Sequence, residues 1–229
     1  ASVLAFSAGC HMDMLNCIKV KGAKITTETR NPKKFTGIVL EIPAEVYVQL
    51  GDESSVTITA KRRVQDQILT TIEEDHLVLE YDTCIINPDS ITIFITTAAL
   101  DFVRVLGSGG VSSKQTIKAD EIELKVDGSG DINLALKAGT VNTKINGSGD
   151  IHLEGRAQSL VASVNGAGDV RAAKLEANSA NIKINGSGDV KVYALDDLNV
   201  KINGSGDVRY DGDPEITKSV NGTGSIKRK

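Results

Sequence analysis

Apolar and polar residues alternate along most of this chain, and the alternation is cleanest from Phe102 onward. Apolar side chains occupy every second position of Ile122–Val126 and again of Ile132–Leu136, on the two sides of a glycine-rich segment. Later segments such as Leu198–Ile202 repeat the arrangement, with Asn and Lys between the apolar residues. A period of two is typical of strands that bury one face, so the sequence predicts an all-β fold.

A glycine motif, Ile/Val-Asn-Gly-Ser-Gly-Asp-Ile/Val, separates these strands at regular intervals. Its five clear copies are Val126–Ile132, Ile145–Ile151, Val164–Val170, Ile184–Val190 and Ile202–Val208. Degenerate copies begin at Leu106 and Val220, and the first glycines of successive copies stand 21, 19, 19, 20, 18 and 18 residues apart. This spacing predicts a β-solenoid (β-helix) of stacked coils of 18–21 residues. The alternative is a sandwich or barrel of hairpins, which does not require the same corner in every turn.

The chain is expected to divide into three parts. Residues 1–17 form a leader, residues 18–106 an irregular, strand-rich N-terminal half of the solenoid, and residues 107–229 the regular repeats. In the N-terminal half, strands are expected over 18–21, 25–30, 37–42, 46–50, 56–60, 76–81 and 90–95. One or two helical turns are expected over Arg63–Thr70, because Val64 and Ile68 share a helical face. Continuation of the solenoid is favoured over a separate all-β unit, and whether both halves share one axis stays open.

Three interpretations compete for the Gly-Ser-Gly-Asp corner. In the structural one, the glycines supply positive φ and close backbone approach, while Asp caps the turn through its carboxylate. Calcium-binding β-rolls need a Gly-Gly-x-Gly-x-Asp nonapeptide, which the motif matches poorly, and phosphate capture needs a helix after the glycines. The structural interpretation is favoured, and a weak cation site and a ligand-binding ladder are the alternatives.

In a solenoid the aspartates of the motif form a column. Its members are Asp131, Asp150, Asp169, Asp189 and Asp207. At strand spacing they stand about 4.8 Å apart, where neighbours repel by ~0.9 kcal/mol even in water. The column therefore needs backbone N–H groups, lysines or a cation to compensate it, and Lys144, Lys183 and Lys201 are the candidate lysines. The degenerate copies replace the Asp by Gly110 and Ser225, which ends the column there.

Composition argues against several classes of function. The net charge of −4 is spread along 229 residues, so no nucleic-acid surface is expected. His11, His76 and His152 are scattered without triad or metal spacing, and a serine repeated in every corner is a poor candidate nucleophile. We therefore expect no catalytic residue, no metal site and no cofactor. Tyr193 and Tyr210 form either a two-ring stack or, as preferred, core or edge packing.

The cysteines and the first residues bear on cellular location. Cys10, Cys17 and Cys84 have no metal-ligand spacing, and the sequence does not select a disulfide pair. Ala1–Cys10 is a short apolar run with small residues before the Cys, similar to the end of a bacterial lipoprotein signal peptide. Ser7 stands where such signals usually carry Leu. The hypothesis is membrane attachment through a lipidated Cys10, and the alternatives are a cloning remnant or a disordered leader.

Phrases outside the repeats carry a family resemblance. They are Ile18–Gly22, Glu28–Asn31, Phe35–Ile38, Val46–Asp52 and Ser55–Ala60. Together with the glycine motifs, they make residues 18–229 resemble the family "putative auto-transporter adhesin, head GIN domain". The resemblance implies a secreted or lipid-anchored protein of a Gram-negative cell envelope with a β-solenoid fold, and it brings no catalytic or binding residues. Glu41–Ala44 departs from the family pattern, where a glycine- or serine-rich turn is common.

These observations predict a non-enzymatic cell-envelope protein, an adhesin or surface-interaction module that presents a β-solenoid. The expected location is an outer-membrane lipoprotein or the periplasm and cell surface, and the partner is an unidentified surface protein or glycan. The absence of Trp argues against a lectin, because sugar sites often use aromatic platforms. The alternatives are a carbohydrate-active enzyme, of the polysaccharide lyase or hydrolase kind, and a periplasmic lipid- or hydrophobe-binding protein.

Overall fold

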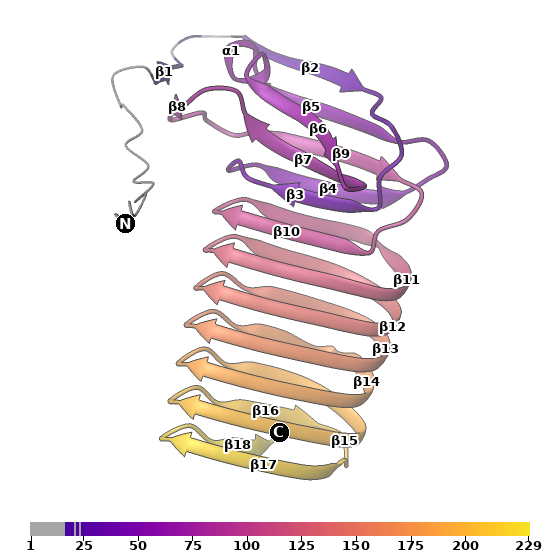
Figure 1. Cartoon of the computed structure of the whole chain (residues 1–229), viewed down its shortest axis with the longest axis vertical. Coiled ribbons are helices and arrows are strands. Elements are labelled where there is room, and N and C mark those ends of the chain that lie inside the picture. Colours follow the sequence, from indigo (N-terminus) through magenta and orange to yellow (C-terminus); the bar gives the residue numbers. More distant parts are fainter. Residues whose placement is uncertain (1–16, 21, 23) are drawn as a thin grey trace, which may run out of the picture.

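The regular part of the molecule is a stack of parallel coils, as a computed structural model of residues 17–20, 22 and 24–229 shows (Figure 1). Five long, bent strands each make up most of one coil. They are β11 (Gly110–Gly128), β12 (Asp131–Gly147), β13 (Ile151–Gly166), β14 (Val170–Gly186) and β15 (Val190–Gly204). Each pairs with the next in parallel, and equivalent residues of the glycine motif face one another across every pair. The predicted β-solenoid is confirmed.

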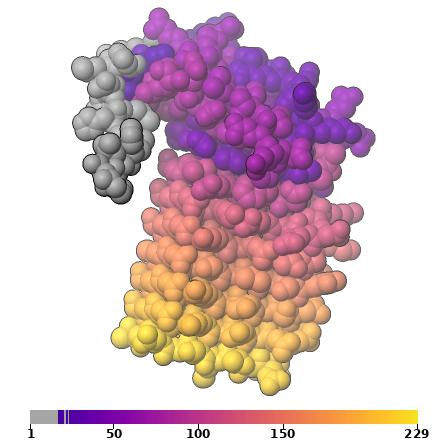
Figure 2. Space-filling model, viewed as in Figure 1, coloured from indigo at the N-terminus to yellow at the C-terminus, as the bar shows by residue number. Residues whose placement is uncertain are grey.

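Each coil buries its alternating aliphatic residues inside the stack. The residues before the corners form one inward row, in which Val126, Ile145, Val164, Ile184 and Ile202 are each 0% exposed. Figure 2 shows the colours crossing the molecule as bands in chain order, so each regular coil packs against its two neighbours. Such ladders bury apolar surface only when coils stack, which explains why the motif repeats rather than occurring once.

The C-terminal end of the stack is closed by charge. The last coil consists of β17 (Glu215–Gly222) and β18 (Ile226–Arg228), below β15 and β16 (Val208–Asp211). In this coil Lys218 pairs with the buried Val200, and Arg228 pairs with the partly buried Tyr210. Charged residues thus occupy two rows whose members in the coils above are buried or partly buried. Charge at an exposed edge disfavours pairing with a further strand.

The N-terminal strands extend both arms of the regular coils. Their bounds are β2 (Ile25–Arg30), β3 (Gly37–Leu40), β4 (Glu45–Leu50), β5 (Ser55–Lys61), β6 (Ile68–Glu73), β7 (His76–Tyr81), β9 (Thr92–Thr97) and β10 (Phe102–Gly107). One arm continues from β11 through β4, β9, β5 and β2, and the other through β10, β3, β7 and β6. All these strands belong to one 16-stranded sheet. The order departs from the chain order, and the outermost pairs β2–β5 and β6–β7 are antiparallel.

The helical segment is shorter than predicted. Helix α1 spans Arg62–Gln65, and β6 begins at Ile68 inside the predicted helical range. Val64 and Gln65 are buried, and the Gln65 amide donates to the carbonyl of Ile58 at 2.8 Å. Of the one or two turns predicted over Arg63–Thr70, one is present, and a second is absent because Ile68 enters the core as part of a strand. A shared helical face and a strand position cannot be separated from spacing alone.

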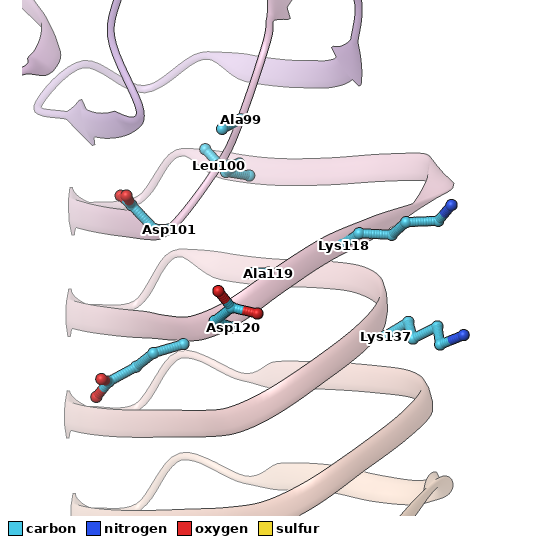
Figure 3. Close-up of a pocket in the computed structure, with 8 residues that line it drawn as sticks. Ala99, Leu100, Asp101, Lys118, Ala119, Asp120 and Lys137 are labelled. Carbon is cyan, nitrogen blue, oxygen red and sulfur yellow. The ribbon is translucent and has the colours of Figure 1, made fainter.

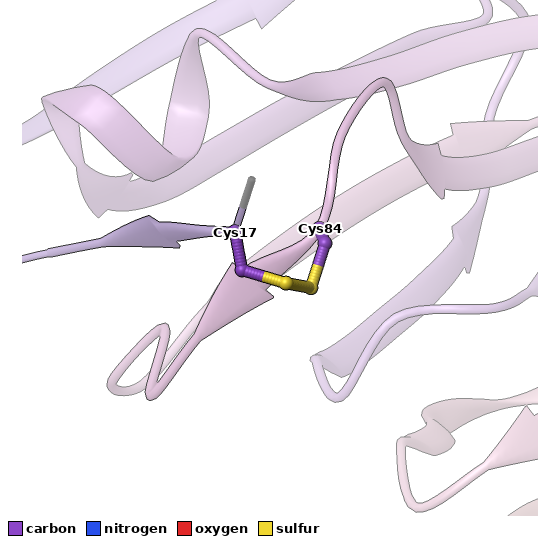
Figure 4. Close-up of a disulfide and its surroundings, with 2 residues drawn as sticks. All are labelled: Cys17 and Cys84. Atoms are coloured by element: carbon purple, nitrogen blue, oxygen red, sulfur yellow. A yellow bond between two sulfur atoms is a disulfide. The ribbon is translucent and has the colours of Figure 1, made fainter. Parts of the chain in front are cut away.

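A disulfide joins Cys17 to Cys84, 67 residues further along the chain (Figure 4). Cys17 precedes the short strand β1 (Ile18–Lys19), which pairs in parallel with β8 (Ile85–Ile86). The bond therefore ties the first described residues to the segment before β9. Cys10, the lipidation candidate, and the other leader residues before Cys17 lie outside the described residues.

Candidate functional site

The two glycines of each corner are required for different reasons. Gly147 has φ +141°, and a Cβ at this position would stand 2.1 Å from the carbonyl oxygen of Gly128 in the preceding coil. Gly149 lacks a positive φ, yet its Cβ would stand 1.9 Å from the carbonyl oxygen of Gly130. The serine between them is exposed. The first glycine therefore supplies an unusual backbone conformation, and both allow adjacent backbones to approach closely.

The carboxylate column connects successive coils. The backbone N–H of Asp150 donates to the Asp131 carboxylate at 2.9 Å, and the same bond recurs at 2.8–3.0 Å through the Ser225 N–H on Asp207. Each carboxylate thus caps the corner of the next coil rather than its own. These bonds confirm that backbone N–H groups compensate the column, and they place the predicted cap on the following coil's corner.

The candidate lysines do not pair with the column. Within the described part of the chain, Lys144, Lys183 and Lys201 form no ion pair with the column, since they precede the corner and project from the opposite arm. Arg171 makes this contact instead, at 2.8 Å to Asp150 and 3.1 Å to Asp169. Its position two residues after Asp169 places it on the same outward face as the column, because side chains alternate along a strand.

Both ends of the column have a structural reason. Ser225 donates its N–H and its hydroxyl to Asp207, and these two bonds hold the pKa of Asp207 below its usual value. At the other end, Gly110 pairs with Glu45, and a Cβ on Gly110 would stand 2.9 Å from the Glu45 carboxylate. Glu45 occupies the place of the column in the preceding coil.

A second polar ladder runs before the corners and was not predicted. The amides of Asn146, Asn165, Asn185 and Asn203 donate in turn to the coil before, at 2.7–3.0 Å. The first acceptor is Asp127. Burial raises the pKa of this carboxyl group, but hydrogen bonds from Asn146 and Arg104 lower it by more, so the pKa lies below its usual value. The constant Asn of the motif was the available signal, and amide ladders of this kind are known from stacked strands.

The acidic residues around Asp101 and Asp120 do not form a metal centre within the described residues. A groove of about 610 Å³ is lined by Asp101, Asp120 and Glu121 together with Lys118 and Lys137. Figure 3 shows the lysine side chains extending away from the Asp101 and Asp120 carboxylates. Within the described residues, no three His, Cys, Asp or Glu side chains lie close enough to hold a metal ion. Likewise, no helix in this part of the chain has the length and apolarity that crossing a membrane requires.

Two aromatic stacks occur at places that sequence reasoning did not select. Tyr193 pairs with Asp211 and Tyr210 with Val192, so the two tyrosines lie in different rows and do not form the two-ring stack that was the less favoured alternative. Tyr210 instead packs partly against the core, which agrees with the preferred alternative. His76 and Phe102 stack at 4.4 Å across the intervening Gly37, whose missing side chain leaves the space.

The second stack, the aromatic pair, consists of Tyr47 on β4 and Phe94 on β9. Their ring centroids are 5.2 Å apart, and Tyr47 is 36% and Phe94 54% exposed. Both residues alternate with buried valines or isoleucines, so their rings project from the outside of the sheet. A groove of about 530 Å³ beside them also includes Lys114 and Gln115.

The aromatic pair belongs to one outward row that crosses the whole stack. Strand pairing places these residues side by side in the order Thr57, Phe94, Tyr47, Ser112, Asn133, His152, Arg171, Lys191, Arg209 and Lys227. The last five residues, which we call the basic row, give one basic side chain per coil. A second groove of about 690 Å³ lies over part of this row and includes Lys114 and Lys174. Lys114 lines both grooves, so the aromatic pair and the basic row share one continuous face.

The fold and its corners define a class of protein, a β-solenoid whose coils are closed by glycine corners and capped by aspartate. The chain matches the family described as "Putative auto-transporter adhesin, head GIN domain" over residues 34–214, and it belongs to that family. Among curated proteins, no match to this chain is found.

Solved structures share the fold. A putative adhesin from Bacteroides fragilis NCTC 9343 has a TM-score of 0.86 and 24% identity, over 93% of this chain and 100% of that chain. A putative adhesin from Parabacteroides distasonis ATCC 8503 has a TM-score of 0.77 and 20% identity, over 93% and 100% of the two chains. A putative lipid binding protein from the same organism has a TM-score of 0.76 and 24% identity, over 93% and 99%. At these identities the likeness shows the fold alone.

Proposed function

We propose that this protein is a non-enzymatic component of the cell envelope that uses the outer faces of its solenoid to bind a surface. Membership of the adhesin family supports this function. The observation that carries it is the row crossing the outside of the sheet, where a pair of exposed rings and five basic side chains lie on one face. Monomeric proteins usually bury rings of this size, so exposed stacked aromatics are typical of binding surfaces.

The envelope location has its own support. The Cys17–Cys84 disulfide favours an oxidising compartment, since cytosolic proteins are generally kept reduced. The lipobox-like sequence before Cys10 leads us to include attachment to the outer membrane through a lipidated Cys10 in the proposal. Labelling of expressing cells with a radioactive fatty acid tests this part: label on the wild type and none on C10S supports it, and an unlabelled wild type contradicts it.

Adhesion is tested with beads coated with the protein. The beads are applied under flow to immobilised mucin, to epithelial cell layers and to encapsulated bacteria, with heat-unfolded protein as the control coating. We expect retention on at least one surface by the folded protein alone. Equal retention of folded and unfolded coatings, or no retention on any surface, would contradict the proposed function. Shortening of an acidic polysaccharide by the purified protein would favour the carbohydrate-active enzyme instead.

A lipid-binding function is the second candidate, because a relative in fold from Parabacteroides distasonis is called a putative lipid binding protein. Against it, side chains fill the inside of the regular coils, where positions such as Leu124 and Ile182 are 0% exposed. Titration with a fluorescent fatty acid separates the two candidates. Saturable binding by the purified protein would support lipid binding, whereas the absence of a signal is expected for a surface-binding module.

A further inference from the structure

The basic row presents its charges at a regular spacing along the stack. His152, Lys191, Arg209 and Lys227 are exposed, and successive members occupy neighbouring parallel strands. The row therefore offers one basic group about every 4.7–4.9 Å. Within the described chain, Lys191, Arg209 and Lys227 form no ion pair within 4.0 Å. No direct ion pair therefore holds these three side chains, although the charges of Arg209 and Lys227 also act on the neighbouring Asp207.

The ligand that matches such a row is a linear anion with one charge per repeating unit. An extended chain of pyranose sugars advances per ring by a distance close to the spacing of strands, and a uronic acid carries one carboxylate per sugar. Lys and Arg side chains bind carboxylates with charge-assisted hydrogen bonds. We propose that this face binds a uronic-acid polysaccharide, laid along the stack from the aromatic pair towards Lys227. The proposal rests on the proposed surface-binding function and specifies its ligand.

The aromatic pair supports a glycan rather than a simple anion. Tyr47 and Phe94 provide apolar surface for the C–H groups of a sugar ring, in the same row as the charges and joined to them through the groove at Lys114. Ser112 and Asn133 lie between the rings and the basic row, where their hydroxyl and amide groups are able to bond sugar hydroxyls. The row thus offers stacking, hydrogen bonding and charge in succession.

The carboxylate column favours a polysaccharide over a nucleic acid. Asp189 and Asp207 precede Lys191 and Arg209 by two residues and share their outward face. Carboxylates repel a uronate as well as a phosphodiester, but they also accept hydrogen bonds from the hydroxyl groups of a sugar chain, and a DNA backbone has no hydroxyl groups to donate. The net charge of −4 opposes both ligands alike. An anionic membrane surface would require basic residues over a broad area, whereas here they form a single line.

The charge part of the proposal is tested with immobilised polygalacturonate. We compare the wild type with K191Q/R209Q and with the matched control K183Q/K201Q, which removes two positive charges from the opposite arm. Wild-type binding is expected to weaken with added salt and to be absent for neutral dextran. K191Q/R209Q should bind about tenfold more weakly and K183Q/K201Q within about twofold of the wild type, since exposed charge pairs contribute up to about 1 kcal/mol each.

The aromatic part is tested with Y47T/F94T, which places β-branched threonines, residues that favour strands, at the two positions. We expect a loss of affinity of about fivefold, and no loss for F102A on the opposite arm, because aromatic contacts contribute about 1 kcal/mol. Thermal melting of every variant shows whether the fold is retained. If Y47T/F94T is destabilised, the single variant F94T, at the more exposed ring, replaces it. Unchanged affinity in a folded variant contradicts the aromatic contribution.

Several outcomes would overturn the proposal. Equal losses of affinity for K191Q/R209Q and K183Q/K201Q would indicate that polygalacturonate is attracted by net charge and not by one particular face. Tighter binding of single-stranded DNA, or of phosphatidylglycerol vesicles, with the same dependence on Lys191 and Arg209 would assign the face to those ligands. If coated beads adhere to surfaces but polygalacturonate is not bound, the ligand is wrong and the proposed function stands. If neither occurs, both are wrong.

Discussion

Single residues at the corner determine how closely two coils approach. Gly166 has φ +137°, and a Cβ there would stand 2.2 Å from the carbonyl oxygen of Gly147. The exposed second residue of the corner, between the two glycines, has no such restriction, as the third motif copy shows by carrying Ala167 in place of serine. Tolerance at the corner therefore changes from one residue to the next.

We predict that Gly166→Ala destabilises the protein by about 2–4 kcal/mol, because it combines left-handed backbone strain with overpacking against a backbone atom. The matched control is Ser187→Ala, at the position that already carries alanine in a neighbouring coil. Thermal melting followed by circular dichroism measures both. The steric explanation requires a clear decrease for the glycine variant and a change within experimental error for the serine variant.

The carboxylates of the ladders make stability depend on pH. The pKa values of Asp127 and Asp207 lie below the ordinary value of 3.8. A group whose pKa is lower in the folded state stabilises the protein above its unfolded pKa, and this contribution is lost as pH falls through the folded pKa. The melting temperature should therefore be level above about pH 5 and fall below about pH 4.

The variant Asp207→Asn tests this assignment. It should melt at a lower temperature than the wild type at neutral pH and show a smaller further decrease on acidification, because the group that titrates is missing. Asp52→Asn, in the exposed loop after β4, is the control. Parallel acid profiles for the wild type and Asp207→Asn would show that this carboxylate does not contribute.

At the scale of elements, the regular strands follow from the sequence and the N-terminal strands only in part. The period of two and the glycine spacing predict β11–β15, because each coil repeats the same alternating strand and the same glycine corner. The insertion of β4 between β9 and β11 has no local signal, since strand order depends on which distant edges are free. Most of the predicted N-terminal strands exist, but their partners were not predictable.

The binding face was harder to predict than the corner. The corner repeats, whereas Tyr47 and Phe94 occur once each and lie 47 residues apart in the sequence, so only the pairing of β4 with β9 brings them together. The basic row was visible in principle, as a basic or amide residue two positions after each motif aspartate. The three lysines before the corner were considered instead, because spacing alone does not show which arm carries a side chain.

Removing the disulfide tests how much the attachment of β1 and β8 contributes to stability. Closing a loop of 67 residues stabilises a protein by about 4 kcal/mol in the chain-entropy model. We predict that C17S/C84S lowers the melting temperature by several degrees. Adding a reductant to the wild type should give the same decrease, and the double variant should not respond to it. A wild type that is insensitive to reduction would show that the bond does not contribute to stability.

At the scale of the whole molecule, each sequence repeat forms one coil, so the number of repeats determines the length of the stack. Residues 147–165 form one complete repeat, and their removal joins Asn146 to Gly166, which is the in-register partner of Gly147. The inward row, the asparagine ladder and the carboxylate column would all remain continuous across the junction. Repeat proteins of this kind tolerate such changes, because each unit contacts only its neighbours.

We predict that the variant lacking residues 147–165 folds into a stack that is shorter by about 4.8 Å. Small-angle scattering measures the length, and circular dichroism measures the strand content. Removal of residues 147–156, about half a repeat, is the control and should prevent cooperative melting, because it displaces inward residues from their rows. Equal behaviour of the two deletions would contradict the modular description.

The carboxylate column also gives the stack a direction along the chain. Each aspartate accepts the N–H of the coil that follows it in the chain, and the last coil ends the series with Ser225. A completed coil therefore presents to the next segment a carboxylate that accepts a hydrogen bond, a row of carbonyl groups and a row of buried aliphatic side chains. We therefore expect the coils to form in chain order as the chain emerges from its N-terminus, each new repeat pairing with the coil before it.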